Sequence, residues 1–199
     1  VRTGIYLLSP MLVGLIGIAD TFVIAVLSEK WIPCIAFLRI LTLVFLVRPF
    51  TTTCQQSILS VGRSDITLKI ELIVNAVALG ILFYSVFVIE SVIGIAIGTL
   101  IAEIVSMLLF MYYGNKIINY SYQEQLQDLL PSLALSGLMG AIVYMIQFLS
   151  VPKGVALILQ IFGGAGFYLL VSYILHFEPF IYLMKMVKER SVSKNKFIN

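Results

Sequence analysis

Six long apolar runs constrain this chain more than any other feature of its sequence. Each run approaches or exceeds the roughly 20 residues that an α-helix needs to cross the hydrocarbon core of a bilayer. The runs cover residues 4–27, 33–61, 66–89, 92–113, 131–150 and 155–175. Because lipid offers the backbone no hydrogen-bonding partner, a spanning segment must satisfy its own amides as a helix. The sequence therefore predicts an all-α, polytopic membrane bundle of about six transmembrane helices.

Composition and motif content exclude several other classes of protein. Of the 199 residues, 60% are hydrophobic and 12% are charged, whereas an ordinary soluble domain carries about 25% charged residues. Cys34 and Cys54 lack the spacing of metal ligands, and we expect both to be buried apolar residues. The sequence has no glycine-rich phosphate loop with a lysine and no cluster of metal ligands. We therefore expect no enzyme activity, no cofactor, no metal site and no nucleic-acid partner.

Polar segments between and after the runs predict the organisation of the chain. Residues 115–130 are rich in Gln, Glu and Asp, and we expect a short interfacial helix there. A bundle over residues 1–184 is expected to be followed by a basic cytoplasmic tail, residues 185–199. The chain begins at Val1 inside a spanning pattern, so we expect it to be the later part of a longer, transporter-like protein.

Positive charges in the loops predict the orientation of the bundle. One side carries nine of them, namely Arg2, Arg63, Lys69, Lys116, Lys185, Lys188, Arg190, Lys194 and Lys196. The other side carries Lys30 and Lys153. Because loops rich in Lys and Arg stay in the cytoplasm, we expect both ends of the chain to be cytoplasmic.

Arg48 is the strongest candidate for a functional residue, because a charge at the bilayer centre costs at least about 2.5–3.5 kcal/mol on insertion scales. It lies 15 residues after Pro33, in the middle of its run. Thr52 and Gln55 follow on the same helical face. Pro49 removes a backbone donor beside Arg48 and is expected to kink the helix. This pattern predicts a polar cavity lined by Arg48, Thr52 and Gln55.

Other polar residues inside the runs leave two readings open. Glu103 lies at about the depth of Arg48, so either an ion pair between the two or a place for Glu103 in the cavity lining is expected. Asp20 and Arg39 lie at comparable depths near the outer leaflet and are predicted partners, although Arg39 can also snorkel outward. The remaining positions are less diagnostic: Glu71 and Asn75 share a face near the cytoplasmic end of their run, and His176 is expected to be an ordinary interfacial residue.

Small residues recur every four positions on two of the runs. Gly94, Gly98 and Ala102 form one row, and Ser132, Ser136 and Gly140 form another. Rows of this kind let two helices approach closely in a membrane. We expect both rows to serve helix packing.

Several motifs resemble those of polysaccharide flippases. The segment Leu59 to Asp65, followed by Leu68 and Lys69, resembles their cytoplasmic Gly-Arg-x-Asp turn. The similarity continues, in the expected order along the chain, at residues 10–20, 28–31, 93–99, 128–131 and 138–140. Glu29 and Lys30 stand where the loop before Trp31 usually has a glycine.

The resemblance implies a Wzx-type oligosaccharide flippase, within the MATE/MOP superfamily that also holds multidrug exporters and lipid II flippases. Such proteins have about 12 to 14 helices in two bundles around a central cavity, and this chain would be the later bundle. The implied substrate is an undecaprenyl-pyrophosphate-linked oligosaccharide, moved across a bacterial inner (plasma) membrane for lipopolysaccharide or another surface polysaccharide. Besides the lipid bilayer, the implied partner is the polysaccharide polymerase machinery.

The resemblance also suggests roles for the charged residues. Arg48 and Arg39 would supply positive charge to the diphosphate, and Glu103 or Asp20 would carry a coupling ion. Two alternatives remain at this point. One is a multidrug or metabolite exporter of the same superfamily, and the other is a membrane assembly protein without a transport cycle.

Overall fold

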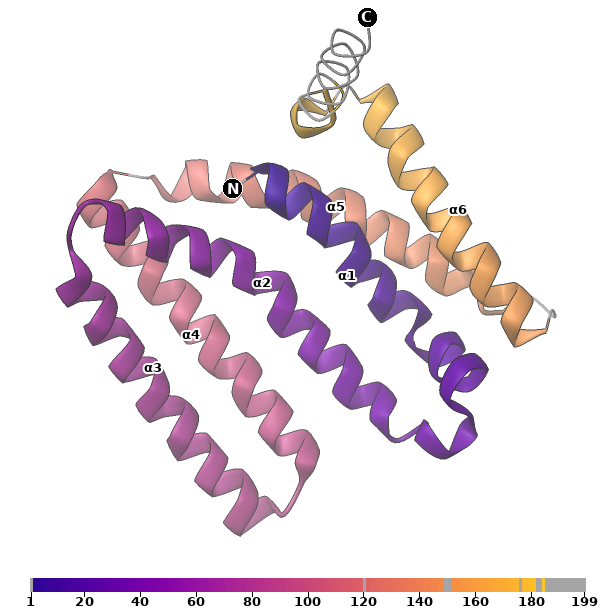
Figure 1. The fold of residues 1–199 in the computed structure, drawn as a ribbon, viewed down its shortest axis with the longest axis horizontal. Helices are drawn as coiled ribbons and strands as arrows, with labels where there is room; N and C mark the ends of the chain where they lie inside the picture. Colours follow the sequence, from indigo (N-terminus) through magenta and orange to yellow (C-terminus); the bar gives the residue numbers. More distant parts are fainter. Residues whose placement is uncertain (1, 120, 149–151, 176, 182–183, 185–199) are drawn as a thin grey trace, which may run out of the picture.

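Six long helices make up nearly all of the described chain in the computed structural model (Figure 1). The structure describes residues 2–119, 121–148, 152–175, 177–181 and 184, so His176 and the predicted tail lie outside the described residues. The helices are α1 (Arg2–Phe22), α2 (Cys34–Ser60), α3 (Ser64–Tyr84), α4 (Val92–Ile118), α5 (Tyr122–Ile146) and α6 (Lys153–Ile174). Short turns η1 (Val23–Leu27) and η3 (Ser85–Ile89) extend α1 and α3, and η2 (Glu29–Trp31) precedes α2. All six are long and apolar enough to cross a membrane, which confirms the predicted fold class.

The predicted interfacial helix over residues 115–130 is wrong. Instead, α4 continues to Ile118 and α5 begins at Tyr122. Asn119 ends α4 in the left-handed conformation, with φ 55°. The hydroxyl of Ser121 accepts a hydrogen bond from the backbone N–H of Gln123, and the carboxylate of Glu124 accepts one from the backbone N–H of Ser121. Together they form a capping box for α5. Pro131, at the start of the predicted run 131–150, therefore lies inside α5.

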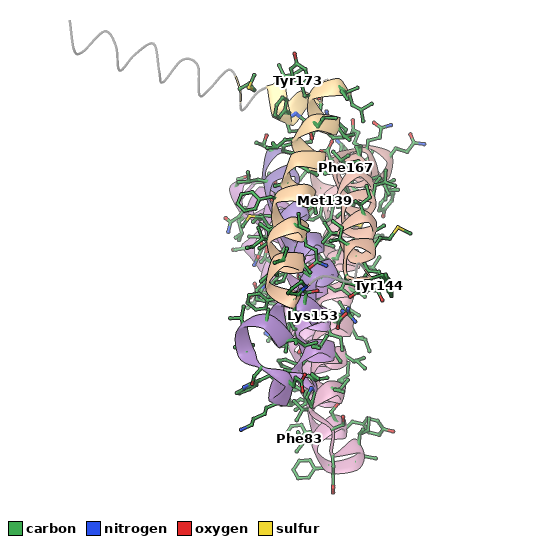
Figure 2. The ribbon with its side chains drawn as sticks, turned by 90° about the vertical axis from the view of Figure 1, so that its right-hand side faces the viewer. Phe83, Met139, Tyr144, Lys153, Phe167 and Tyr173 are labelled. Atoms are coloured by element: carbon green, nitrogen blue, oxygen red, sulfur yellow. The ribbon has the colours of Figure 1, made fainter. Side chains whose placement is uncertain are left out.

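The helices lie side by side in the order α3, α4, α2, α1, α5, α6, as a curved row rather than a closed ring (Figure 1). Seen along the row from the α6 side, the molecule is narrow (Figure 2). Consecutive helices alternate in direction, so the neighbours α2 and α4 run parallel, as do α1 and α5. At one end of the helix axes, here called the Arg63 end, lies the turn between α2 and α3. At the opposite end, here called the Lys30 end, lies the turn between α1 and α2.

Close contacts between helices depend on small residues. A Cβ at Gly98 would lie 2.4 Å from Ile81 of α3, and one at Gly140 would lie 2.6 Å from Val13 of α1. In the second row, the buried Ser136 donates a 2.7 Å hydrogen bond to the hydroxyl of Ser9. The packing role expected for the two small-residue rows is therefore confirmed.

Apolar clusters fill the space on either side of α1. One joins α1 to α2, α3 and α4 around Phe50, Ile58, Ile70 and Phe110. The other joins α1 to α5 and α6, and in Figure 2 its member Met139 lies beside α6. These clusters fix the rotation of each helix and therefore decide which side chains are left uncovered.

Candidate functional site

One face of α2 carries polar side chains that no other described helix covers. Arg48, Thr52 and Gln56 are exposed and recur every four residues, which places them on one helical face. On the other side of α2, Phe50 and Ile58 are buried in the apolar cluster. The burial of that apolar side holds the polar face outward.

Arg48 lies in the middle of its helix. It is 12 residues before Ser60 and 14 residues after Cys34, or about 18 Å and 21 Å from the two ends at a rise of 1.5 Å per residue. Its guanidinium carbon lies 5.9 Å from the centre of the Phe45 ring, and no ion pair involves Arg48 within the described part of the chain. The charge is therefore uncovered at the depth where lipid contact costs most.

The helix continues through Pro49 without interruption. Two hydroxyls near this proline donate hydrogen bonds to backbone carbonyls of the same helix. Thr52 donates to the carbonyl of Arg48 at 2.8 Å, and Thr53 donates to the carbonyl of Pro49 at 2.7 Å. The hydroxyl proton of Thr52 is thus engaged, while its oxygen remains an acceptor on the polar face. The expected kink at Pro49 stays a prediction.

The polar face extends from α2 onto α3. The Gln55 side chain is directed to α3, where its Nε2 donates a hydrogen bond to Oε1 of Glu71. Asn75 follows Glu71 by one helical turn, and both are exposed. Gln56 was not among the residues predicted for the cavity, and Glu71 and Asn75 were considered less diagnostic. Their spacing of four residues was the available signal, but only the fold places α3 beside Gln55.

Glu103 is not brought into an ion pair with Arg48. It lies on α4, is partly buried, and is absent from the ion pairs formed by the described residues. On the same helix, Thr99 is exposed and donates to the carbonyl of Ile95 at 3.0 Å, while Ser106 is buried. Equal depth did not bring the two charges together.

Asp20 and Arg39 form the ion pair that their depths predicted. The Nη2 atom of Arg39 lies 2.7 Å from Oδ2 of Asp20, and their side chains are 34% and 33% exposed. The pair joins the last part of α1 to the first part of α2, close to the turn that holds Lys30. Both charges are compensated there, so this pair differs from Arg48, and a place for it in a cavity stays a prediction.

The larger hollows lie away from Arg48. A pocket of about 590 Å³ opens at the Arg63 end among α1, α2, α4 and α5, where its lining includes Arg2, Thr53 and Asp128. An apolar groove of about 810 Å³ lies among α1, α5 and α6 and is lined by residues such as Met11 and Leu169. Arg2 also forms ion pairs with Asp128 and Glu178, which links the start of α1 to α5 and to the segment after α6. No group of metal-ligating side chains occurs within the described residues.

Comparison with known proteins gives one informative similarity. No family model matches the chain, and no solved structure matches it. The chain is 23% identical over 166 residues to "Teichuronic acid biosynthesis protein TuaB" of Bacillus subtilis (strain 168). The similarity covers 80% of this chain and 34% of TuaB, so the chain spans about a third of the length of this curated relative. With its six candidate spans, the chain is thus a membrane protein that is similar to a protein of polysaccharide biosynthesis.

Proposed function

We propose that this chain is one helix bundle of a longer transporter that flips lipid-linked oligosaccharide from the inner to the outer leaflet of a bacterial plasma membrane. The observation that carries the proposal is the uncovered polar face of α2, with Arg48 at mid-span. The similarity to a teichuronic acid biosynthesis protein supports polysaccharide as the substrate class. The chemistry proposed is translocation, without an enzymatic step.

The physical case rests on the cost of moving charge and hydroxyl groups through hydrocarbon. A diphosphate and its sugars need a hydrated path that supplies positive charge, because neither can shed its water into lipid. Arg48, Thr52 and Gln56 provide one wall of such a path. The remainder of a longer protein would provide the opposite wall, and rocking of the two parts would open the path to each side in turn.

The contacts of the charged residues favour transport of an anionic substrate over export of cationic drugs and over a purely structural role. A purely structural assembly protein should pair each charge at membrane depth, as Asp20 pairs Arg39, whereas Arg48 has no such partner within the described chain. An exporter of cationic drugs would gain nothing from an uncovered arginine. In the proposed transporter, undecaprenyl diphosphate is the carrier, and the polymerase machinery receives the product. Glu103, partly buried on α4, is the proposed site of ion coupling.

The test is Arg48→Ala in the full-length protein. A hydrogen bond to a charged group contributes about 1.5–3 kcal/mol, so export of the polysaccharide should fall by roughly ten- to a hundredfold. Membrane abundance should stay near normal, because the Arg48 side chain supports no other described helix. Export is measured as surface polysaccharide per unit of protein in the membrane, in cells that depend on this transporter.

Matched variants separate binding from stability. Arg63→Ala removes another exposed arginine, from the turn between α2 and α3, and should export normally. If Arg48 pairs with Glu103 in another state of the cycle, Arg48→Ala and Glu103→Ala should each lower abundance, and the double variant should recover it. Normal export by Arg48→Ala would refute the proposed function.

A further inference from the structure

The uncovered polar face is larger than a site for a diphosphate requires. Beyond Arg48 it includes the amide groups of Gln56 and Asn75 and the hydrogen-bonded pair of Gln55 and Glu71. Only one of these groups is a cation and only one is a carboxylate. The rest are neutral groups that can both donate and accept hydrogen bonds.

These groups lie at different depths along the axes of α2 and α3. Gln55 is 5 residues from Ser60 on α2, and Glu71 and Asn75 are 7 and 11 residues from Ser64 on α3. At 1.5 Å per residue these positions lie about 8, 10 and 16 Å from the Arg63 end, while Arg48 lies about 18 Å from it. The neutral groups and the carboxylate therefore lie between Arg48 and the nearer end of the bundle.

Gln55, Gln56, Glu71 and Asn75 are here called the polar strip. Their chemistry fits hydroxyl-rich groups better than lipid or phosphate. Uncovered amide and carboxylate groups inside a membrane span cost free energy unless water or a polar ligand contacts them. Glu71 would repel a diphosphate, and Arg48 would attract one, so charge complementarity orients an anionic ligand with its phosphates at Arg48. Sugar hydroxyls, which donate and accept, can satisfy Gln55, Gln56, Glu71 and Asn75 together.

We propose that Gln55, Gln56, Glu71 and Asn75 form a subsite for the sugar residues of the transported lipid, beside the place of Arg48 for its diphosphate. This inference rests on the proposed function, because it assigns the sugar part of the same substrate. The strip that begins at Gln55 discriminates between oligosaccharides, and Arg48 recognises the diphosphate that all of them share.

The experiment compares two ligands on the purified full-length protein. One is undecaprenyl diphosphate that carries the complete oligosaccharide repeat, and the other is undecaprenyl diphosphate that carries a single sugar. Neutral hydrogen bonds contribute about 0.5–1.5 kcal/mol each, so Asn75→Ala and Gln55→Ala should each weaken binding of the oligosaccharide form by roughly two- to tenfold. Binding of the single-sugar form should change much less. Arg48→Ala should weaken binding of both forms equally.

A control makes the comparison specific. Gln123→Ala removes an exposed glutamine at the start of α5 and should change neither affinity.

The outcomes distinguish this inference from the function on which it rests. If Asn75→Ala and Gln55→Ala bind both ligands normally while Arg48→Ala loses both, the sugar subsite is refuted and the transporter proposal stands. Equal losses for both ligands in Asn75→Ala and Gln55→Ala would also refute the subsite. Normal binding of both ligands by Arg48→Ala would refute the diphosphate assignment itself.

Discussion

The α2 helix carries its two arginines in different ways. Arg39 is held by Asp20 of α1 at 2.7 Å, whereas Arg48 contacts the ring of Phe45 and faces outward. The first arrangement stabilises the junction of two helices. The second leaves a charge available, which is the property that a binding residue needs and a structural residue lacks.

The Asp20–Arg39 pair should contribute measurably to stability. Arg39→Gln leaves Asp20 partly buried without its partner, and should lower the free energy of unfolding by about 1–3 kcal/mol, between the values for exposed and buried pairs. Thermal unfolding in detergent, followed by the loss of the monodisperse peak in size-exclusion chromatography, measures this. The double variant Asp20→Asn/Arg39→Gln should regain part of the loss. An unchanged midpoint for Arg39→Gln would show that the pair contributes nothing.

Ser28 lies in a backbone conformation that suits glycine. Its φ of 83° and ψ of 165° fall in a region that glycine alone adopts without strain. Ser28→Gly should therefore raise the free energy of unfolding by about 1 kcal/mol or more. Gly62, with φ 77° in the turn between α2 and α3, provides the opposite test, since Gly62→Ala should lower the unfolding midpoint. A lower midpoint for Ser28→Gly would contradict this account of the loop.

Among the elements, helices were predictable and their junctions were not. Length and apolar content decide whether a segment spans a membrane, and both are local properties, so all six helices could be predicted. The polar segment 115–130 was misread because composition does not distinguish an interfacial helix from the ends of two long helices. The Ser121 and Glu124 spacing of a capping box was the local signal that places the start of α5.

Contacts between helices were predictable only in part. Depth along a span can be counted from the sequence, and it found the Asp20–Arg39 pair. It did not give the rotation of each helix, which the apolar clusters determine through contacts far apart in the sequence. For this reason equal depth left open an ion pair between Arg48 and Glu103 that the described residues do not form, while the link from Gln55 to Glu71 was not foreseen.

The contact between α3 and α4 depends on Gly98. A Cβ there would lie 2.4 Å from Cγ2 of Ile81, a β-branched residue whose side chain has little freedom to move aside. Gly98→Leu should separate the two helices and lower the free energy of unfolding by about 1–3 kcal/mol, with less folded protein recovered from the membrane. Gly80→Leu on α3 is the matched control, because a Cβ there meets no atom within 4 Å. Equal recovery of the two variants would mean that α4 does not rest on Ile81.

At the scale of the whole molecule, the helices form an open row with one polar strip. The strip lies on α2 and α3, while α1 and α6 border an apolar groove of about 810 Å³. In the proposed transporter, the polar strip would meet water or substrate and the apolar surface would meet lipid. The similarity to a protein of which this chain covers 34% agrees with that reading.

The orientation of the row remains a prediction and can be measured. Nine positive residues on one side against two on the other predict that the Arg63 end is cytoplasmic. With Cys34 and Cys54 replaced by alanine, a cysteine at Ser64 should react with a membrane-impermeant maleimide only after the cells are opened. A cysteine at Lys30 should react in intact cells. Reaction of the Ser64 position in intact cells would reverse the assignment.

The pairing of helices that are not consecutive has a consequence for synthesis. Because α2 rests chiefly on α4, its main partner is complete only after the 58 residues between Ser60 and Ile118 have been made. At roughly 5–20 residues per second this interval lasts about 3 to 12 s. During it the surface of α2 that α4 covers lacks that partner. We therefore expect the half-made bundle to be more open to proteolytic quality control than the complete one.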